Sequence, residues 1–177
     1  MTIEPVQHIL VSLGVPYALI GAHAMAARGY PRFTLAVDLL TTDSRVLDRS
    51  IWIELERQGA TVDCRRGDED DPLAGVVHIL LADQSDIDIV VGKWPWETRV
   101  VERAETMTVA GVELAVPRTS DLILLKLAAG GYLDRHDAAA LLQLGDREAL
   151  IREVDESIGE VYPDVRELWR ELRASIP

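Results

Sequence analysis

The spacing of apolar residues in the first 116 positions limits the folds open to this chain. Short runs rich in β-branched residues, at positions 35–42, 76–82 and 86–92, have the length and composition of buried strands. Between them, apolar residues recur three or four positions apart, as in residues 4–13 and 45–58, which predicts helices. Strands that alternate with helices in this way predict an α/β (α+β) fold with a mixed sheet flanked by helices.

The last third of the sequence has a different pattern. Residues 117–177 contain only helical spacing, broken at Gly145 and Pro163. We therefore expect an α/β body over residues 1–116 and a helical C-terminal region over residues 117–177. No Ser/Gly-rich linker separates the two parts, so the helices are expected to pack on the body.

A glycine turn stands between the first predicted strand and the helix after it. In "IGAHAMAARGYPR", Gly21 and Ala22 follow the strand and open an alanine-rich helix. Backbone N–H groups at such a turn can bind a phosphate. The same pattern also serves simply to let a helix pack closely on a sheet, so the turn alone does not indicate a nucleotide site.

Aspartates accompany two of the predicted strands. Asp38 lies within "LAVDLLTT", and Asp86 and Asp88 lie within "SDIDIVVG". Side chains two positions apart on a strand point to the same face, so Asp86 and Asp88 can share a divalent cation. The position that would pair with Asp38 in the same way is occupied by Ala36.

In their order, these elements resemble the polymerase-β-like nucleotidyltransferase fold. The strand, the glycine turn, the small-residue helix, "GYPRFT" and the acidic strand follow one another as they do in that superfamily. The resemblance is closest to the small bacterial minimal and abortive-infection (AbiEii-like, type IV toxin) nucleotidyltransferases. There, a Gly-Gly or Gly-Ser turn precedes an Arg-x-Thr-x-Asp-x-Asp strand. The matches span roughly residues 15–145.

The resemblance implies a role for individual residues of the first strands. Gly21 and Ala22 match the phosphate-binding turn, and Arg32 and Thr34 match the residues that lead into the acidic strand. Asp38 matches the second carboxylate of the metal-binding pair.

Further matches lie downstream. Asp88 matches the third carboxylate best, with Asp86 as the alternative. In "VPRTSDLILLKLAAGGYLDRHDAAALL", Lys126 matches a lysine that can reach the triphosphate, and Asp134 and Asp137 match the aspartate pair that follows it.

The resemblance also implies a reaction. Members of the superfamily transfer a nucleoside monophosphate from an NTP to a hydroxyl group, with Mg²⁺ or Mn²⁺ held by carboxylates. The abortive-infection relatives suggest a toxin–antitoxin or phage-defence setting, with a cognate antitoxin or another protein as partner.

Ala36 departs from the family pattern, because it stands where the first metal-binding carboxylate is expected. Three explanations remain open. The chain is a catalytically degenerate binding or regulatory module, or Asp86 supplies the missing ligand from another strand. Alternatively, "SDIDIV" is itself the paired motif, although no glycine turn and helix precede it.

Composition excludes several other classes of function. The formal net charge of −12 argues against non-specific binding to nucleic acid, which requires clustered Lys and Arg. Cys64 is the only cysteine, which excludes an internal disulfide and fits a reducing compartment. No apolar stretch is long enough to span a bilayer, so we expect a cytoplasmic protein with no membrane partner.

Overall fold

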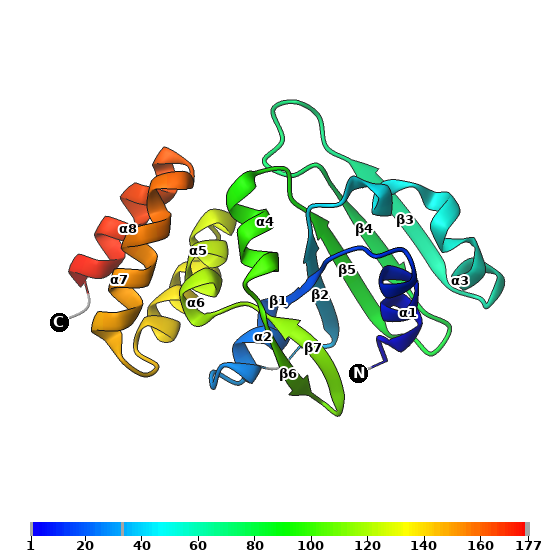
Figure 1. The fold of residues 1–177 in the computed structure, drawn as a ribbon, viewed down its shortest axis with the longest axis horizontal. Helices are drawn as coiled ribbons and strands as arrows, with labels where there is room; N and C mark the ends of the chain where they lie inside the picture. Colours follow the sequence, from blue (N-terminus) through cyan, green and yellow to red (C-terminus); the bar gives the residue numbers. More distant parts are fainter. Residues whose placement is uncertain (1, 33, 176–177) are drawn as a thin grey trace.

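The computed structural model describes residues 2–32 and 34–175. Its centre is a five-stranded mixed sheet in the order β1-β2-β5-β4-β3 (Figure 1). β2 and β5 pair in parallel, and the other neighbours pair antiparallel. The strands are β1 (Ala18–Ile20), β2 (Ala36–Thr41), β3 (Thr61–Arg66), β4 (Gly75–Leu80) and β5 (Asp86–Val91). A separate hairpin is formed by β6 (Glu105–Val109) and β7 (Val112–Val116).

Helices surround this sheet, and the last four gather at one side of it (Figure 1). In the first two thirds of the chain they are α1 (Glu4–Ser12), α2 (Gly21–Ala27), α3 (Ile53–Arg57) and α4 (Pro95–Glu102). The C-terminal helices are α5 (Thr119–Ala129), α6 (Tyr132–Leu142), α7 (Arg147–Ser157) and α8 (Pro163–Ser175), with a 3₁₀ turn at Ile158–Glu160. This arrangement confirms the expected mixed sheet with a helical C-terminal part. No helix among the described residues has the length and apolar character needed to cross a bilayer.

One predicted helix is wrong. Residues 45–58 form two 3₁₀ turns, Ser44–Leu47 and Arg49–Trp52, before the short α3. Asp48 has an extended backbone, and its side chain accepts a hydrogen bond from the Ser50 N–H at 2.9 Å, which starts a new turn. An aspartate that caps its own backbone competes with the helix in this way.

The alternation of side chains along the central strands determines where polar groups can stand. On β5, Ile87, Ile89 and Val91 are buried in the core. The intervening Asp86 and Asp88 are half-buried on the opposite face, as the two-residue period of a strand requires.

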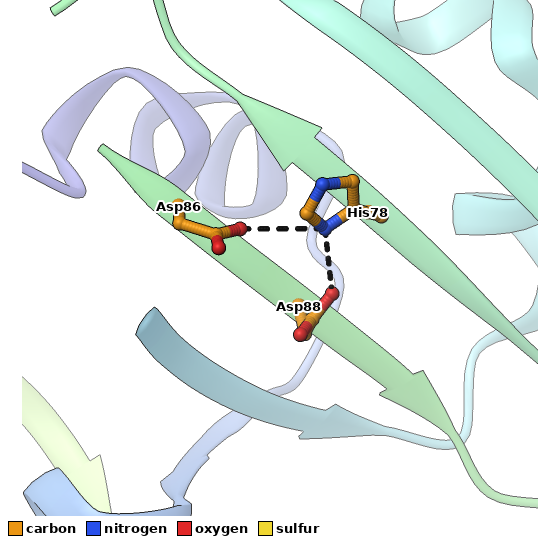
Figure 2. Close-up of side chains that lie close together, drawn as sticks. All are labelled: His78, Asp86 and Asp88. Carbon is orange, nitrogen blue, oxygen red and sulfur yellow. Dashed lines mark hydrogen bonds and ion pairs between the residues drawn. The ribbon is translucent and has the colours of Figure 1, made fainter. Parts of the chain in front are cut away.

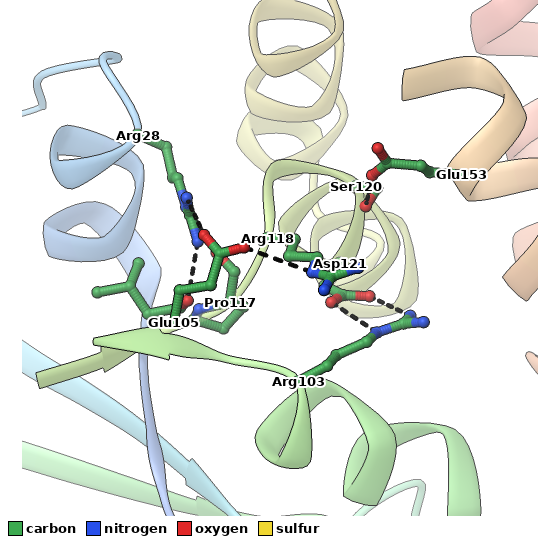
Figure 3. Close-up of polar contacts among 9 residues, drawn as sticks. Arg28, Arg103, Glu105, Pro117, Arg118, Ser120, Asp121 and Glu153 are labelled. Atoms are coloured by element: carbon green, nitrogen blue, oxygen red, sulfur yellow. Dashed lines mark hydrogen bonds and ion pairs between the residues drawn. The ribbon is translucent and has the colours of Figure 1, made fainter. Parts of the chain in front are cut away.

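Polar contacts, some of them buried, join the helical region to the body (Figure 3). Asp121 of α5 is fully buried and forms a bidentate ion pair with Arg103, whose Nε lies 2.9 Å from Asp121 Oδ2. Arg28 donates to the Pro117 carbonyl at 2.8 Å and pairs with Glu105 at 2.9 Å. These contacts fix the start of α5 against α4 and the β6–β7 hairpin.

Candidate functional site

The register of β2 and β5 brings the predicted acidic residues onto one face of the sheet. Asp38 pairs with Asp88 across the parallel strands, and Ala36 pairs with Asp86. Directly paired residues point to the same face. Ala36, where the family resemblance implies a carboxylate, therefore has a carboxylate next to it on β5.

Asp38 lies against the glycine turn. A Cβ atom at Gly21 would stand 2.0 Å from Asp38 Oδ2, and Gly21 has a φ of +64°. Only glycine leaves room for the carboxylate there and adopts this backbone conformation without strain. The turn thus positions Asp38, a function that the sequence pattern did not suggest.

The surroundings of Asp38 disfavour its ionised form. Its pKa is raised to about 6, first by burial and then by the charge of Asp88, while Lys126 partly opposes both effects. Asp86 adds a smaller contribution in the same direction as Asp88. Three carboxylates are thus close enough to repel one another, an arrangement that a bound cation would relieve.

Lys126 shares a pocket of about 200 Å³ with Asp38 and Gly21, but it already has acidic partners. Its Nζ lies 2.8 Å from Asp134 Oδ1 and 3.1 Å from Asp137 Oδ2. Arg32 also pairs with Asp137, which is almost fully buried. Lys126, which the resemblance implies can reach the triphosphate, and Arg32, which leads into β2, are therefore both ion-paired with α6.

The other two predicted residues have mainly local contacts. The Thr34 hydroxyl donates to the Ala36 carbonyl at 3.1 Å, which stabilises the entry into β2. Ala22 is the second residue of α2 and is half-buried. Because α2 is only seven residues long, its N-terminus supplies a small helix dipole.

The structure adds one residue that the sequence analysis missed. His78 of β4 pairs with Asp88 in the antiparallel register, so it faces the same side of the sheet. Its Nδ1 lies 2.9 Å from Asp88 Oδ1 and 3.3 Å from Asp86 Oδ1 (Figure 2). The signal available was a single polar residue within the apolar run "VVHILLA".

The acidic residues divide between two cavities. Asp38 lines the pocket beside Lys126, whereas Asp88 and His78 line a groove of about 590 Å³ on β3 and β4. Arg65 and Arg66 also line this groove. The predicted residues therefore share one face of the sheet, with Asp38 directed to one cavity and Asp88 to the other.

The donor atoms on this face suit a divalent metal ion. One oxygen each of Asp86 and Asp88 and a ring nitrogen of His78 lie within 4.8 Å of one another. Asp86 Oδ1 is buried and accepts no hydrogen bond from any residue in 2–32 or 34–175. A buried carboxylate oxygen without a partner is costly unless a cation or another donor satisfies it.

Comparisons with known proteins connect this arrangement to a known fold. No family model and no curated protein matches the sequence. Among solved structures, a nucleotidyltransferase-like antigenic protein from Paracoccidioides brasiliensis aligns over 99% of this chain and 87% of its own, with 16% identity and a TM-score of 0.52.

Two further structures are similar at lower scores. The antibiotic-resistance factor ANT(2'')-Ia aligns over 97% of this chain and 89% of its own, with 17% identity and a TM-score of 0.48. The lincosamide antibiotic adenylyltransferase LnuA aligns over 81% and 96%, with 10% identity and a TM-score of 0.49. At 16% identity, the likeness to the Paracoccidioides brasiliensis protein carries information about the fold only. The chain has the nucleotidyltransferase fold.

Proposed function

We propose that this protein is a divalent-metal-dependent nucleotidyltransferase in which Asp86 replaces the carboxylate missing at Ala36. The observation that carries the proposal is the parallel register, which sets Asp86 beside Ala36 and Asp88 beside Asp38. Three carboxylates on one face are costly to keep without a cation. Their presence where the family resemblance implies a metal site supports a working site.

Each of the predicted residues has a role in this proposal. Asp38, Asp86 and Asp88 hold Mg²⁺ or Mn²⁺, which supplies positive charge at the α-phosphate and at the departing oxygen when it is bound. Gly21 and Ala22 leave the backbone of the turn open to the triphosphate. Lys126 contributes charge on the same side, next to Asp38.

In the proposed reaction, an acceptor hydroxyl oxygen forms a bond to the α-phosphorus of an NTP. The bond from that phosphorus to the oxygen bridging the β-phosphate breaks, and pyrophosphate leaves. The hydroxyl proton passes to a carboxylate of the site or to water. In a site of this kind the chain's main contribution is to orient the two substrates in line.

Calorimetric titration of ATP, GTP, CTP and UTP tests the proposal. We expect at least one NTP to bind in Mn²⁺ or Mg²⁺ and to lose its affinity in EDTA and in Asp88→Asn. Asp164→Asn, an exposed aspartate on α8, is the matched control and should bind as the wild type does. Transfer itself is followed with α-labelled NTP and total RNA or cell protein as acceptor. Absence of metal-dependent NTP binding would sink the enzyme proposal.

A second candidate function is a catalytically degenerate binding or regulatory module. Ala36 favours it, and so do the ion pairs that Arg32 and Lys126 make with Asp137, since these cations are then not free for a phosphate. Such a module would act through a protein partner. The cognate antitoxin implied by the family resemblance stays a prediction, which co-purification of the chain from its native cells can test.

A further inference from the structure

His78, Asp86 and Asp88 form a compact group on two neighbouring strands (Figure 2). His78 lies on β4 and the aspartates lie on β5, with His78 and Asp88 paired directly. All three are half-buried, so their positions are defined by the sheet while one side stays open to solvent. A group held by rigid strands is better ordered than one held by loops.

Hydrogen bonding alone does not satisfy this group. His78 Nδ1 can carry one proton, and Asp88 Oδ1 at 2.9 Å is its partner. Asp86 Oδ1 lies 3.3 Å from the same nitrogen, yet it is buried and accepts no hydrogen bond within the described part of the chain. One shared proton satisfies two carboxylates less well than a cation that contacts both oxygens and the ring nitrogen.

The donor set determines which cation fits. Mg²⁺ prefers oxygen ligands in strict octahedral geometry and seldom takes a nitrogen. An imidazole nitrogen beside two carboxylates favours first-row transition ions, whose affinity for such sites rises from Mn²⁺ to Co²⁺. All-carboxylate sites lack this preference.

We propose that His78 is a further ligand beside Asp86 and Asp88, and that the metal site they share selects a transition ion, such as Mn²⁺ or Co²⁺, over Mg²⁺. This inference adds to the proposed function, and a catalytic role for the metal rests on that function. The preference itself depends only on the three ligands.

The surroundings of the site favour a metal ion that can bind a further ligand over one that only stabilises the fold. Three protein ligands leave coordination positions free, unlike the closed four-ligand sites of structural zinc. Two of the three ligands, His78 and Asp88, line the groove of about 590 Å³, so further ligands would approach the ion from there. A phosphate oxygen or water can reach the metal from that side, and Arg65 and Arg66 add positive charge to the groove.

Direct metal binding to the full chain tests this inference without any substrate. Free Mn²⁺ is measured by electron paramagnetic resonance with Mg²⁺ as competitor, and Co²⁺ by its visible absorption. We expect Mn²⁺ to bind the wild type at least about tenfold more tightly than Mg²⁺. His78→Ala should lose most of that preference and change the Co²⁺ spectrum, whereas His8→Ala, on the exposed side of α1, should change neither.

His78→Asp keeps the test informative if His78→Ala fails to fold. It converts the donor set to oxygens only, so the affinity for Mg²⁺ relative to that for Mn²⁺ should be higher than in the wild type. Equal affinity of the wild type for the two ions, or an unchanged ratio in both His78 variants, would overturn the inference. His78-dependent metal binding without NTP binding would instead refute the proposed function and leave the metal site standing.

Discussion

Asp86 stands directly beside Ala36 in the parallel pairing of β2 and β5, two positions along from the pair formed by Asp38 and Asp88. A carboxylate lost from one strand is thus matched by a carboxylate on its neighbour, on the same face of the sheet. The proposal that Asp86 acts as a relocated metal ligand rests on this relationship.

Asp38→Asn should stabilise the protein in EDTA at neutral pH. The folded-state pKa of Asp38 is raised from 3.8 to about 6, so wild-type stability falls as pH rises through that window. Allowing for the partial solvent exposure of Asp38, the variant should gain about 1–2 kcal/mol above pH 6. Urea unfolding at pH 4 and pH 7.5 measures this gain, which should nearly vanish at pH 4. A variant less stable than the wild type at pH 7.5 would contradict the claim that ionised Asp38 destabilises the fold.

Gly21→Ala should displace Asp38 as well as strain the turn. The added Cβ would meet Asp38 Oδ2 at 2.0 Å, at a φ of +64°. Gly14 is a matched control, because its φ is +61° and no described atom lies within 4 Å of its added Cβ. Gly14→Ala should cost about 1 kcal/mol of unfolding free energy, and Gly21→Ala clearly more. In an Asp38→Ala background the two costs should become similar; a persistent difference would place the clash elsewhere.

Arg103→Met should destabilise the junction between α4 and α5 in a pH-dependent way. Burial raises the pKa of Asp121, and Arg103 is the partner that counteracts this. Without Arg103 the buried carboxylate is left unpaired, at a cost of about 3–5 kcal/mol at neutral pH. The loss should shrink as pH falls and Asp121 becomes protonated in the folded state. Chemical unfolding of the wild type and Arg103→Met at pH 7.5 and pH 5 measures the loss of unfolding free energy. An equal loss at the two pH values would contradict this explanation.

Asp134→Asn should strengthen NTP binding if Lys126 serves the triphosphate. Asp134 Oδ1 lies 2.8 Å from Lys126 Nζ and competes with a phosphate for it. Removing that charge should lower the Kd for the bound NTP by about two- to tenfold, or roughly 0.4–1.4 kcal/mol. Calorimetry in Mn²⁺ measures the effect. An unchanged or weaker affinity would assign the Lys126 ion pairs a structural role.

The sequence predicted most of the elements of the fold, because local patterns determine them. The β-branched runs became β2, β4 and β5, and the glycine turn opened α2 as expected. The helix predicted over residues 45–58 does not form, because the side chain of Asp48 starts a new turn. The spacing of apolar residues does not reveal this local competition.

The candidate site was less accessible to sequence reasoning. Its acidic residues were identified from their strands, but the pairing of Asp86 with Ala36 depends on the register between strands about 50 positions apart. His78 escaped notice because β4 reads as an ordinary buried strand, and only its antiparallel register with β5 brings the imidazole to Asp88.

Exchanging the carboxylate across the two strands tests the central claim most directly. Asp86→Ala should abolish metal-dependent NTP binding, and adding Ala36→Asp to it should restore binding, because the new carboxylate stands at the paired position. Calorimetry in Mn²⁺ and Mg²⁺, with thermal unfolding as a control for folding, compares wild type, single and double variants. Restored binding in the double variant is the predicted result. Full binding by Asp86→Ala alone, or a folded double variant no better than Asp86→Ala, would contradict the claim that Asp86 replaces the lost ligand.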